Sequence, residues 1–329
     1  MQPNKVFDPN MLQSPSAYDH PVDTIEIRET HVSWVFLTGS YAYKIKKPVK
    51  FGDILDFSTL DLREKFCHEE LKLNSRFSTD LYLSVFSINS KGKVNGPGKP
   101  IEYGVLMKQL PEKYLMSSLL KKKDVTESAV NQIAKNLAVF HDKTEKVPEW
   151  GEMKYIAEKW DENFRTTSQF RKVNETFQQQ IEGFMLGNRG LFQERINEGC
   201  ITDNHGDLQS HNIFILPDEK IRIFDCIEFN PLLRYGDLAE DVGFLAMDLD
   251  YWGEQNLSSI FVESYIKHSG DELLEEIIDF FKCYRAYVRG KVYGFQASNE
   301  TNEIERKKQI EISNRYYELA ELYIPKFIT

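Results

Sequence analysis

The stretch that decides the fold is residues 201–241, ITDNHGDLQSHNIFILPDEKIRIFDCIEFNPLLRYGDLAED. It holds two apolar segments, residues 213–216 and 221–224, which are joined by the turn-forming run 217–220. Apolar runs of this length on either side of turn-forming residues are typical of a β-hairpin. Because a hairpin brings its two ends side by side, the side chains that flank the two strands are expected to converge.

Polar side chains flank both strands of this predicted hairpin. Asp207 and Asn212 precede the first strand, and Asp225 follows the second. Two carboxylates and an amide in one place form a set of hard oxygen ligands. Such sites suit magnesium, which is usually held by one or two carboxylates and completed by water and substrate phosphates. The sequence therefore predicts a magnesium site at the ends of the hairpin.

The spacing of these residues matches a phosphoryl-transfer template. In kinases, an Asp of the catalytic loop receives the proton of the attacking hydroxyl, an Asn five residues later holds magnesium, and an Asp after a strand also holds it. With His205-Gly206 before Asp207, in place of His-Arg, the chain resembles the aminoglycoside phosphotransferase-like family of small-molecule kinases. The resemblance implies that Asp207 is catalytic and that Asn212 and Asp225 are metal ligands.

The residues after the hairpin extend this resemblance. Residues 234–239, RYGDLA, are similar to the family's closing motif, in which an Asp, here Asp237, supports the catalytic loop that His205 helps to orient. Residues 224–230, FDCIEFN, and 244–250, FLAMDLD, resemble a subgroup of uncharacterised phosphotransferase-like proteins, some of which are fused to a P-loop ATPase domain. The resemblance is strong over residues 201–252 and weaker elsewhere.

Each of these features also has an ordinary structural explanation. His-Gly-Asp is a short combination of common residues, and an Asp after an apolar strand is often a helix cap or a turn former. The complete set of Asp, Asn, hairpin and second Asp at these spacings is much rarer. The combination therefore favours the kinase-like interpretation, which structural context has to test.

Residues 24–47 alternate between apolar and polar side chains, which predicts antiparallel strands with a tight turn at Gly39. In the kinase-like small lobe, a strand lysine reaches the phosphates of the nucleotide. Lys44 follows two apolar residues, as that lysine does in the family, and is the expected one. Lys46 lies on the same strand face two residues later and stays open as the alternative.

A helix is predicted to start at the capping box Ser58-Thr59-Leu60-Asp61 and to run to about residue 77. Its expected inward stripe consists of Leu62, Phe66, Leu73 and Phe77. Glu69 and Glu70 flank that stripe on opposite sides, so periodicity does not choose between them. Resemblance to the subgroup favours Glu70 as the partner of the strand lysine, a pairing that kinases use to position that lysine.

Two further strands are predicted at residues 81–88 and 101–107, joined by an exposed Gly- and Pro-rich turn. In the two-lobed fold, the hinge follows them, and the backbone at Met107 and Gln109 would bind the nucleotide base. The expected domains are a nucleotide-binding lobe over residues 1–110 and a helical lobe with the catalytic loop and substrate cleft over 111–329. The chain has no Gly-x-Gly-x-x-Gly loop and no P-loop motif.

Composition limits the partners of this chain. It has 329 residues and a formal net charge of -10, which argues against nucleic acid or an anionic membrane as the main ligand. The four cysteines have no paired spacing, so neither a zinc site nor a disulfide framework is indicated. No segment has the length and apolar character of a signal peptide or membrane span. A cytoplasmic protein is therefore expected.

Two groups of side chains beyond the motifs bear on the substrate. The first is an acidic and aromatic cluster made of Asp248, Asp250, Tyr251 and Trp252. This cluster could lie at the rim of the substrate cleft and attract a cationic amine, or it could be ordinary surface charge. The second is a basic group made of Arg285, Arg289 and Lys291. These residues approach an anionic substrate or form structural ion pairs, and structural pairing is the favoured interpretation.

The chain is thus predicted to adopt an α+β, protein-kinase-like two-lobed fold, with a small antiparallel-sheet lobe and a larger, mainly helical lobe. The resemblance implies a phosphotransferase that uses ATP, or another nucleoside triphosphate, and Mg²⁺ to modify a hydroxyl of a small molecule. Two other classes stay open. One is a catalytically silent nucleotide-binding or regulatory module, which the missing glycine-rich loop motivates. The other is a protein kinase, for which the separation of twelve residues between Asp225 and Asp237 leaves little room for a peptide-docking segment. No motif specifies the acceptor, ATP or GTP, or the oligomeric state.

Overall fold

The computed structural model describes residues 7–52 and 54–327, so residues 1–6 of the expected first lobe lie outside the described residues. The chain divides into two compact units. The sheet unit consists of residues 1–118 and 212–231, and the helical unit consists of residues 119–211 and 232–329. The chain first passes from one unit to the other within α2 (Met116–Leu120).

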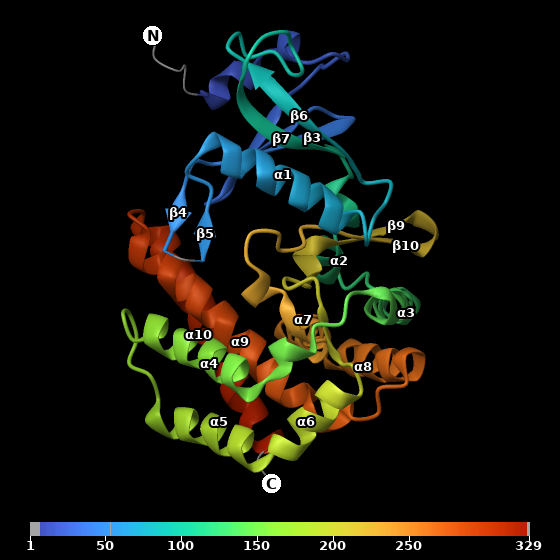
Figure 1. Cartoon of the computed structure of the whole chain (residues 1–329), viewed down its shortest axis with the longest axis vertical. Coiled ribbons are helices and arrows are strands. Elements are labelled where there is room, and N and C mark those ends of the chain that lie inside the picture. Colours follow the sequence, from blue (N-terminus) through green and yellow to red (C-terminus); the bar gives the residue numbers. More distant parts are fainter. Residues whose placement is uncertain (1–6, 53, 328–329) are drawn as a thin grey trace. The chain divides into compact units, whose positions relative to one another are not determined.

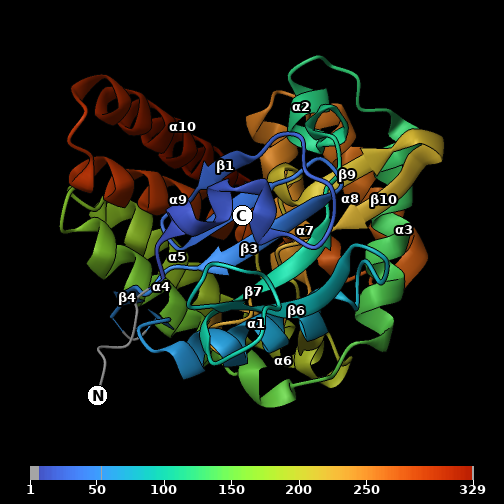
Figure 2. The same ribbon diagram turned by 90° about the horizontal axis from the view of Figure 1, so that it is seen from above.

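The sheet unit is built on a five-stranded antiparallel sheet with the strand order β1-β2-β3-β7-β6 (Figures 1 and 2). Its strands are β1 (Glu26–Glu29), β2 (Ser33–Leu37), β3 (Tyr41–Lys46), β6 (Tyr82–Asn89) and β7 (Pro100–Lys108). A separate two-stranded pair is formed by β4 (Lys50–Phe51) and β5 (Leu55–Asp56). The strands predicted from residues 24–47, 81–88 and 101–107 are therefore present.

The central strand β3 sends alternate side chains to opposite faces of the sheet, as its period of two requires. Tyr43 and Ile45 join a buried cluster that includes Phe36 and Phe86 and that the N-terminal residues cover. Ala42 points to the other face, where it packs in a cluster with Cys67 of helix α1. The two lysines of β3 share this second face with Ala42, and α1 lies across it (Figure 1).

The N-cap of helix α1 (Leu60–Asn74) lies one residue later than predicted. Thr59, not Ser58, is the N-cap, and its hydroxyl accepts a hydrogen bond from the Leu62 N–H at 3.2 Å. The predicted inward stripe is also wrong, apart from Leu73. The residues that α1 buries are Arg63, Cys67, Glu70, Leu73 and Asn74. The stripe failed because this helix buries charged and polar groups that find partners on the sheet, which hydrophobic periodicity cannot reveal.

The predicted hairpin is confirmed within the sheet unit. Strand β9 (Ile213–Leu216) pairs antiparallel with β10 (Lys220–Ile223), and Ile213 lies opposite Ile223. The pairing continues past the strands, because the Phe224 N–H donates to the Asn212 carbonyl at 3.0 Å. Asn212 and the residue that follows Phe224 are therefore at the same end of the hairpin, as the sequence predicted.

The helical unit contains eight of the long helices in the described ranges and one short antiparallel strand pair. The helices are α3 (Glu127–Lys143), α4 (Met153–Thr167), α5 (Glu175–Gly187), α6 (Arg189–Asn197), α7 (Ala239–Tyr251), α8 (Gln255–Ser269), α9 (Leu274–Asn299) and α10 (Glu303–Phe327). The strands are β8 (Ile201–Asp203) and β11 (Tyr235–Asp237), which pair through residues at the two ends of the motif block.

Helix α7 is the centre of the helical unit. Its residues 239–249 are all buried, and the helix packs against α8 and α9, while α10 runs alongside α9 (Figure 1). Gly243 permits the contact with α9, because a Cβ atom there would stand 3.0 Å from the backbone of Phe281. Helix α7 is therefore enclosed by its neighbours within the helical unit.

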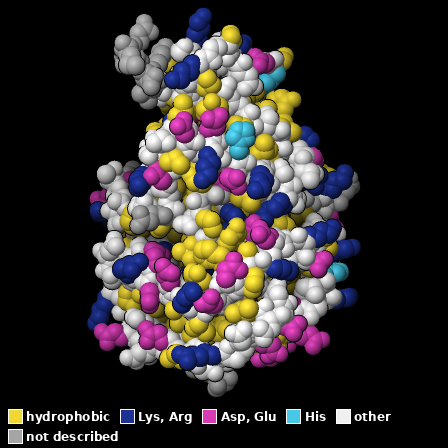
Figure 3. All heavy atoms as spheres, in the orientation of Figure 1, with side chains coloured by type: hydrophobic (Ala, Val, Ile, Leu, Met, Phe, Trp, Pro, Cys, Tyr) yellow, Lys and Arg dark blue, Asp and Glu magenta, His cyan; other side chains and the backbone are white. Residues whose placement is uncertain are grey.

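Charged side chains of both signs are interspersed on the face that Figure 3 shows. No helix within residues 7–52 and 54–327 combines the length and the apolar character needed to cross a bilayer.

Candidate functional site

The two lysines of β3 share one buried carboxylate. Lys44 Nζ donates to Glu70 Oε1 at 2.8 Å, and Lys46 Nζ donates to Glu70 Oε2 at 2.6 Å. Glu70 has no exposed surface, whereas the side chain of Glu69 is 39% exposed. Glu70 therefore pairs with both Lys44 and Lys46, which the sequence had left open as alternatives.

Lys44 and Lys46 differ in their second partners. Lys44 also contacts the carboxylate of Asp225, and Lys46 also contacts the carboxylate of Glu228. The side chain of Lys46 is 2% exposed and that of Lys44 is 14% exposed. Lys46 is thus enclosed between two buried acids, while Lys44 stands beside Asp225, whose side chain is 43% exposed.

The charges of this cluster are set by burial and by mutual attraction. Burial alone would raise the pKa of Glu70, but Lys44 and Lys46 outweigh it and lower that pKa to about 2. Burial would lower the pKa of Lys44, and the carboxylates of Asp225 and Glu70 more than reverse this, so its pKa is raised. Burial holds the pKa of Glu228 above its usual range. Lys44 therefore carries a permanent positive charge next to a solvent-accessible acid.

The segment that carries Asp225 is held by its backbone. The Asp225 N–H donates to the Tyr82 hydroxyl at 3.1 Å, and the next N–H, that of Cys226, donates to Asn74 Oδ1 at 2.8 Å. Asp225 itself has φ 64°, a left-handed conformation that non-glycine residues seldom adopt and that is often found at functional sites. Sequence reasoning missed Tyr82, Asn74 and Glu228, because their partners lie far away in the chain.

Asn212 and Asp225 provide an amide oxygen and a carboxylate at the same end of the hairpin. Within the described residues, no group of three or more His, Cys, Asp or Glu side chains is arranged to hold a metal. A donor set of one carboxylate and one amide suits magnesium, since this ion normally keeps several waters and takes further oxygens from substrate phosphates. The pair therefore fits the predicted ion as a partial protein shell.

The turn at Gly39 and the predicted hinge are joined by Gln109. The Gly39 N–H donates to Gln109 Oε1 at 2.8 Å, and the Gln109 N–H donates to the Ser40 carbonyl at 3.0 Å. Gly39 has φ 92°, which only glycine adopts readily. Met107 is 8% exposed and lies opposite Ala42 of β3. The N–H of Gly39 is therefore already bonded to Gln109, one of the two residues expected at the base-binding site.

The loop that carries Asp207 belongs to the helical unit and is fixed by Asp241 of α7. The N–H groups of His205 and Gly206 donate to the Asp241 carboxylate at 2.7 and 2.9 Å. The pKa of Asp241 is lowered to about 2, because His141 and the loop outweigh its burial. The buried His141 forms hydrogen bonds with Tyr265 at 2.7 Å and with Asp241 at 3.4 Å. Asp241 was missed from the sequence, where it is one acid among several.

Asp207 and His205 are linked within this loop. The Asp207 N–H donates to His205 Nδ1 at 3.2 Å, and the side chain of Gln209 donates to both Asp207 carboxylate oxygens at 2.9 and 3.0 Å. His205 is fully buried, so it acts inside the loop and has no surface with which to meet a ligand. Arg285 of α9 donates to the Gly206 carbonyl at 3.1 Å and adds a further support.

Asp237, the predicted support of the catalytic loop, has other partners. Its carboxylate accepts two hydrogen bonds from the fully buried Arg195, at 2.6 and 2.7 Å, and one from the Ala239 N–H at 2.8 Å. Arg195 also binds Asp271. The backbone carbonyl of Asp237 accepts a hydrogen bond from Asn204 at 3.3 Å, so Asp237 meets the residue before the loop, and Asp241 meets the loop itself.

The two acids of the cluster, for which a cleft rim and ordinary surface charge were both open, instead have partners inside the protein. Asp248 is buried and accepts the Ser210 N–H at 2.7 Å, directly after the catalytic loop. Asp250 pairs with Lys282 at 2.6 Å and with the Tyr323 hydroxyl. Among the basic group, Arg285 pairs with Glu240 at 3.2 Å and Lys291 pairs with Glu162, as structural pairing predicted.

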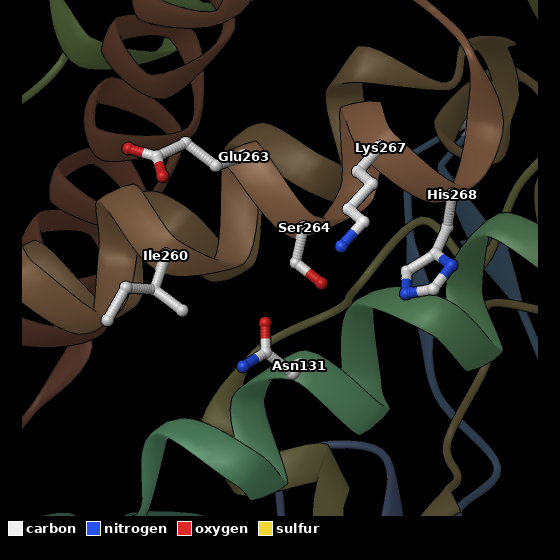
Figure 4. A pocket seen from close by; sticks show the side chains of 6 residues that line it. All are labelled: Asn131, Ile260, Glu263, Ser264, Lys267 and His268. Carbon is white, nitrogen blue, oxygen red and sulfur yellow. The ribbon is translucent and has the colours of Figure 1, made fainter.

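One pocket of about 310 Å³ lies between α3 and α8 (Figure 4). The side chains that line it are Asn131, Ile260, Glu263, Ser264, Lys267 and His268. None of the residues predicted to act in catalysis or binding is among them. The pocket is therefore separate from the groups described above.

No family model matches this chain. Uncharacterised proteins of Mycobacterium tuberculosis and Mycobacterium bovis are 35% identical to it over 285 residues, and the match covers 83% of this chain. It covers 56% of each of those proteins, so the chain spans a little over half the length of the curated relatives it matches.

Solved structures resemble the chain over almost its whole length. A choline/ethanolamine kinase family protein from Mesorhizobium loti matches with a TM-score of 0.54 and 10% identity, covering 94% of both chains. The GDP complex of aminoglycoside 2'-phosphotransferase-IIIa matches with a TM-score of 0.53 and 12% identity, covering 91% of this chain and 94% of that one. An ethanolamine kinase of Plasmodium vivax gives 0.52 and 14%, covering 91% and 82%. The predicted kinase-like fold, with a small sheet lobe and a larger helical lobe, is confirmed.

Proposed function

We propose that this chain, which has the kinase-like fold of the aminoglycoside phosphotransferase-like proteins, is a small-molecule phosphotransferase. The reaction is transfer of the terminal phosphoryl group of ATP, or of another nucleoside triphosphate, to a hydroxyl of a small acceptor. Fold alone does not fix chemistry. The proposal therefore depends on the side chains that the fold holds in place.

The sheet unit provides the groups for the nucleotide. Lys44 neutralises phosphate charge and is positioned by Glu70, while the backbone at Met107 and Gln109 meets the base. Asn212 and Asp225 hold magnesium, which when bound supplies positive charge to the phosphates. The observation that carries the proposal is the contact of Lys44 with both Glu70 and Asp225, because it joins the phosphate-binding lysine, its positioning acid and a metal-binding acid in one cluster.

The helical unit provides the groups for the acceptor. Asp207 accepts the proton of the attacking hydroxyl, and His205 and Asp241 keep the loop rigid around it. Little covalent chemistry is required of the protein in phosphoryl transfer, so positioning and electrostatic stabilisation provide most of the acceleration. A rigid loop with its carboxylate held by Gln209 meets this requirement.

The proposal is tested by release of nucleoside diphosphate over a panel of small hydroxyl compounds, with Mg²⁺ and either ATP or GTP. Asp207→Asn should lower turnover by about 10²- to 10⁴-fold and leave nucleotide binding nearly unchanged, since a general base contributes that much. Asp142→Asn, an exposed acid near the end of α3, is the matched control. Equal turnover of the Asp207 variant and the wild type would remove Asp207 from its role.

A catalytically silent nucleotide-binding module is the second candidate. The engaged Gly39 amide and the missing glycine-rich loop favour it, because backbone groups for cradling phosphates are then few. Such a module would bind ATP with magnesium and release no diphosphate with any acceptor. The same assay, combined with calorimetric titration of the nucleotide, separates the two candidates.

A further inference from the structure

Arg289 of α9 is a cation with an incomplete set of partners. Its guanidinium lies over the rings of Tyr293 and Tyr316, at 4.9 and 5.7 Å, and its Nη2 donates to the Tyr293 hydroxyl at 3.1 Å. Its Nε is buried and has no hydrogen-bond acceptor. No carboxylate in the described part of the chain forms an ion pair with Arg289, although the residue remains partly exposed.

Three more deeply buried arginines of the described residues each pair with a carboxylate, which Arg289 does not. Arg63 pairs with Glu102 at 2.8 Å, Arg195 with Asp237 at 2.6 Å, and Arg285 with Glu240 at 3.2 Å. Charge removed from water is costly unless an opposite charge and hydrogen bonds compensate for it. Arg289 contacts only the faces of two tyrosine rings and one hydroxyl group. A bound anion would supply the opposite charge and the hydrogen-bond acceptors that these contacts lack.

The surroundings of Arg289 connect it to the catalytic loop. Burial by itself lowers the pKa of Arg289, but Tyr316, Tyr293, Asp207 and Asp248 together raise it. Geometry also places Arg289 close to this loop, because it lies one turn after Arg285 on the same face of α9, and Arg285 donates to the carbonyl of Gly206, the residue before Asp207, at 3.1 Å. Asp248 is already bonded to the Ser210 N–H, so it is committed to the loop.

An aromatic stack supports Arg289 from α7 and α10. Tyr251 and Tyr316 are stacked with ring centroids 4.0 Å apart and an interplanar angle of 9°, and Arg315 lies 4.4 Å above Tyr251. Tyr251 ends α7, and Tyr316 and Arg315 lie on α10, which runs alongside α9, the helix of Arg289 (Figure 1). Rigid rings hold the guanidinium in one orientation, which favours recognition of a planar or tetrahedral anion by its two-pronged donor geometry.

We propose that Arg289 binds an acid group, a carboxylate or a phosphate, on the acceptor whose hydroxyl faces Asp207. This inference rests on the proposed phosphotransferase function and names the class of its acceptor, a hydroxyl compound that carries a negative charge. It replaces the cationic amine that Asp248 and Asp250 suggested, because both acids are used inside the protein. The same guanidinium chemistry would also suit a phosphate of the nucleotide, and the experiment separates these sources.

The experiment compares hydroxyl compounds that differ in an acid group. Ethanolamine is compared with serine, and glycerol with glycerate and glycerol 3-phosphate. Binding is measured as stabilisation against thermal unfolding, which does not require turnover and grows with the ratio of probe concentration to its dissociation constant. Phosphoryl transfer is followed in parallel as the Michaelis constants of acceptor and nucleotide.

Three variants are compared with the wild type. Arg289→Met removes the guanidinium, and Arg289→Lys keeps the charge without the fork. Arg171→Met is the matched control, because Arg171 also lies over a tyrosine ring, that of Tyr317 at 4.4 Å, but is an exposed residue outside the catalytic groups. Circular dichroism of each variant establishes that it is folded.

We expect at least one acid-bearing probe to stabilise the wild type more than its counterpart without the acid group does. Arg289→Met should weaken the binding of that probe by about 10- to 100-fold, the range for a hydrogen bond to a charged group, with Arg289→Lys in between and Arg171→Met unchanged. Equal binding to the wild type of probes with and without the acid group would overturn the proposal. So would a rise in the Michaelis constant of the nucleotide in place of that of the acceptor, which would assign Arg289 to nucleotide phosphate.

The two proposals fail separately. If acid probes bind through Arg289 but no diphosphate is released with any of them, the anion site stands and the phosphotransferase function fails. If diphosphate is released at rates that depend on Asp207 but not on Arg289 or on the acid group, the function stands and the acceptor class fails.

Discussion

Lys46 differs from Lys44 in being enclosed by acids, and this predicts a structural role. Its ammonium group contacts Glu70 and Glu228 and is almost fully buried. Removing one partner of a buried ion pair typically costs about 3–5 kcal/mol, because the remaining charge is uncompensated. Lys46→Met should therefore lower the free energy of unfolding by about that amount, measured by urea denaturation.

A second substitution serves as the control for that loss. Lys46→Met combined with Glu228→Met replaces the pair by apolar side chains and should recover part of the stability, since buried pairs are often replaceable in this way. If the double variant is no more stable than the single one, the uncompensated Glu228 charge is not the cause of the loss.

Glu70 predicts how stability depends on pH. Its pKa is about 2 in the folded chain and 4.5 is its ordinary value, so the unfolded chain binds the proton more readily between these values. The stability that Glu70 contributes is present above about pH 4.5 and is lost as the pH falls toward 2, on the order of 3 kcal/mol in total. Glu70→Gln should flatten the acid limb of the curve of unfolding free energy against pH.

The neighbouring Glu69→Gln is the matched control for this experiment, because Glu69 is exposed and touches neither lysine. Its acid limb should follow that of the wild type. An unchanged acid limb in the Glu70 variant would contradict the strong pairing of Glu70 with the two lysines.

At the scale of the secondary-structure elements, α7 holds the loop that carries Asp207. Asp241 accepts two backbone N–H groups of the loop and is completely buried. Asp241→Asn removes the charge and turns part of the acceptor into a donor, which should cost about 1.5–3 kcal/mol of stability for each charged hydrogen bond lost. Turnover should fall more than nucleotide affinity, as measured by initial rates and by calorimetric titration.

Asp237→Asn provides the comparison, because its carboxylate is bound by Arg195 and does not contact the loop. This variant should have a lower free energy of unfolding than the wild type. Its turnover per folded molecule should be unchanged. Equal losses of turnover per folded molecule in both variants would contradict the separate roles of the two acids.

The elements that could be predicted from the sequence are those with a local signature. The hairpin β9–β10 was predictable because two apolar strands flank a turn within twelve residues, and Asn212 and Asp225 followed from it. The buried face of α1 was not predictable, since Arg63, Glu70 and Asn74 are buried only because partners on distant strands and on the hairpin compensate them. Asp241 was missed for the same reason, because its ligands are backbone groups thirty-five residues away.

At the scale of the whole molecule, the division into two compact units predicts two steps of unfolding. Each unit has its own buried core, and multidomain chains commonly depart from two-state behaviour. Native-state hydrogen exchange in increasing urea should show α1 and β3 losing protection at a different concentration from α7 and α9. A nucleotide with magnesium at about 100 times its dissociation constant should raise the free energy for the sheet unit by about 2.7 kcal/mol.

Coincident loss of protection in both units would show that they unfold as one. Stabilisation of α7 and α9 without α1 and β3 would contradict the proposed role of Lys44, in the sheet unit, in binding the nucleotide. Neutral hydroxyl compounds, added without nucleotide, serve as the control.

The contact between Lys44 and Asp225 has a consequence for ligand choice. Lys44 already pairs with the carboxylate of Asp225. An incoming anion therefore has to displace that carboxylate before it can bind Lys44. A singly charged anion gains too little electrostatic energy from Lys44 to displace Asp225. Under the proposed function, a polyanion bound to a cation would leave Asp225 to that cation and pair with Lys44 itself, so we expect the protein to bind the polyanion and the cation together more tightly than either one alone.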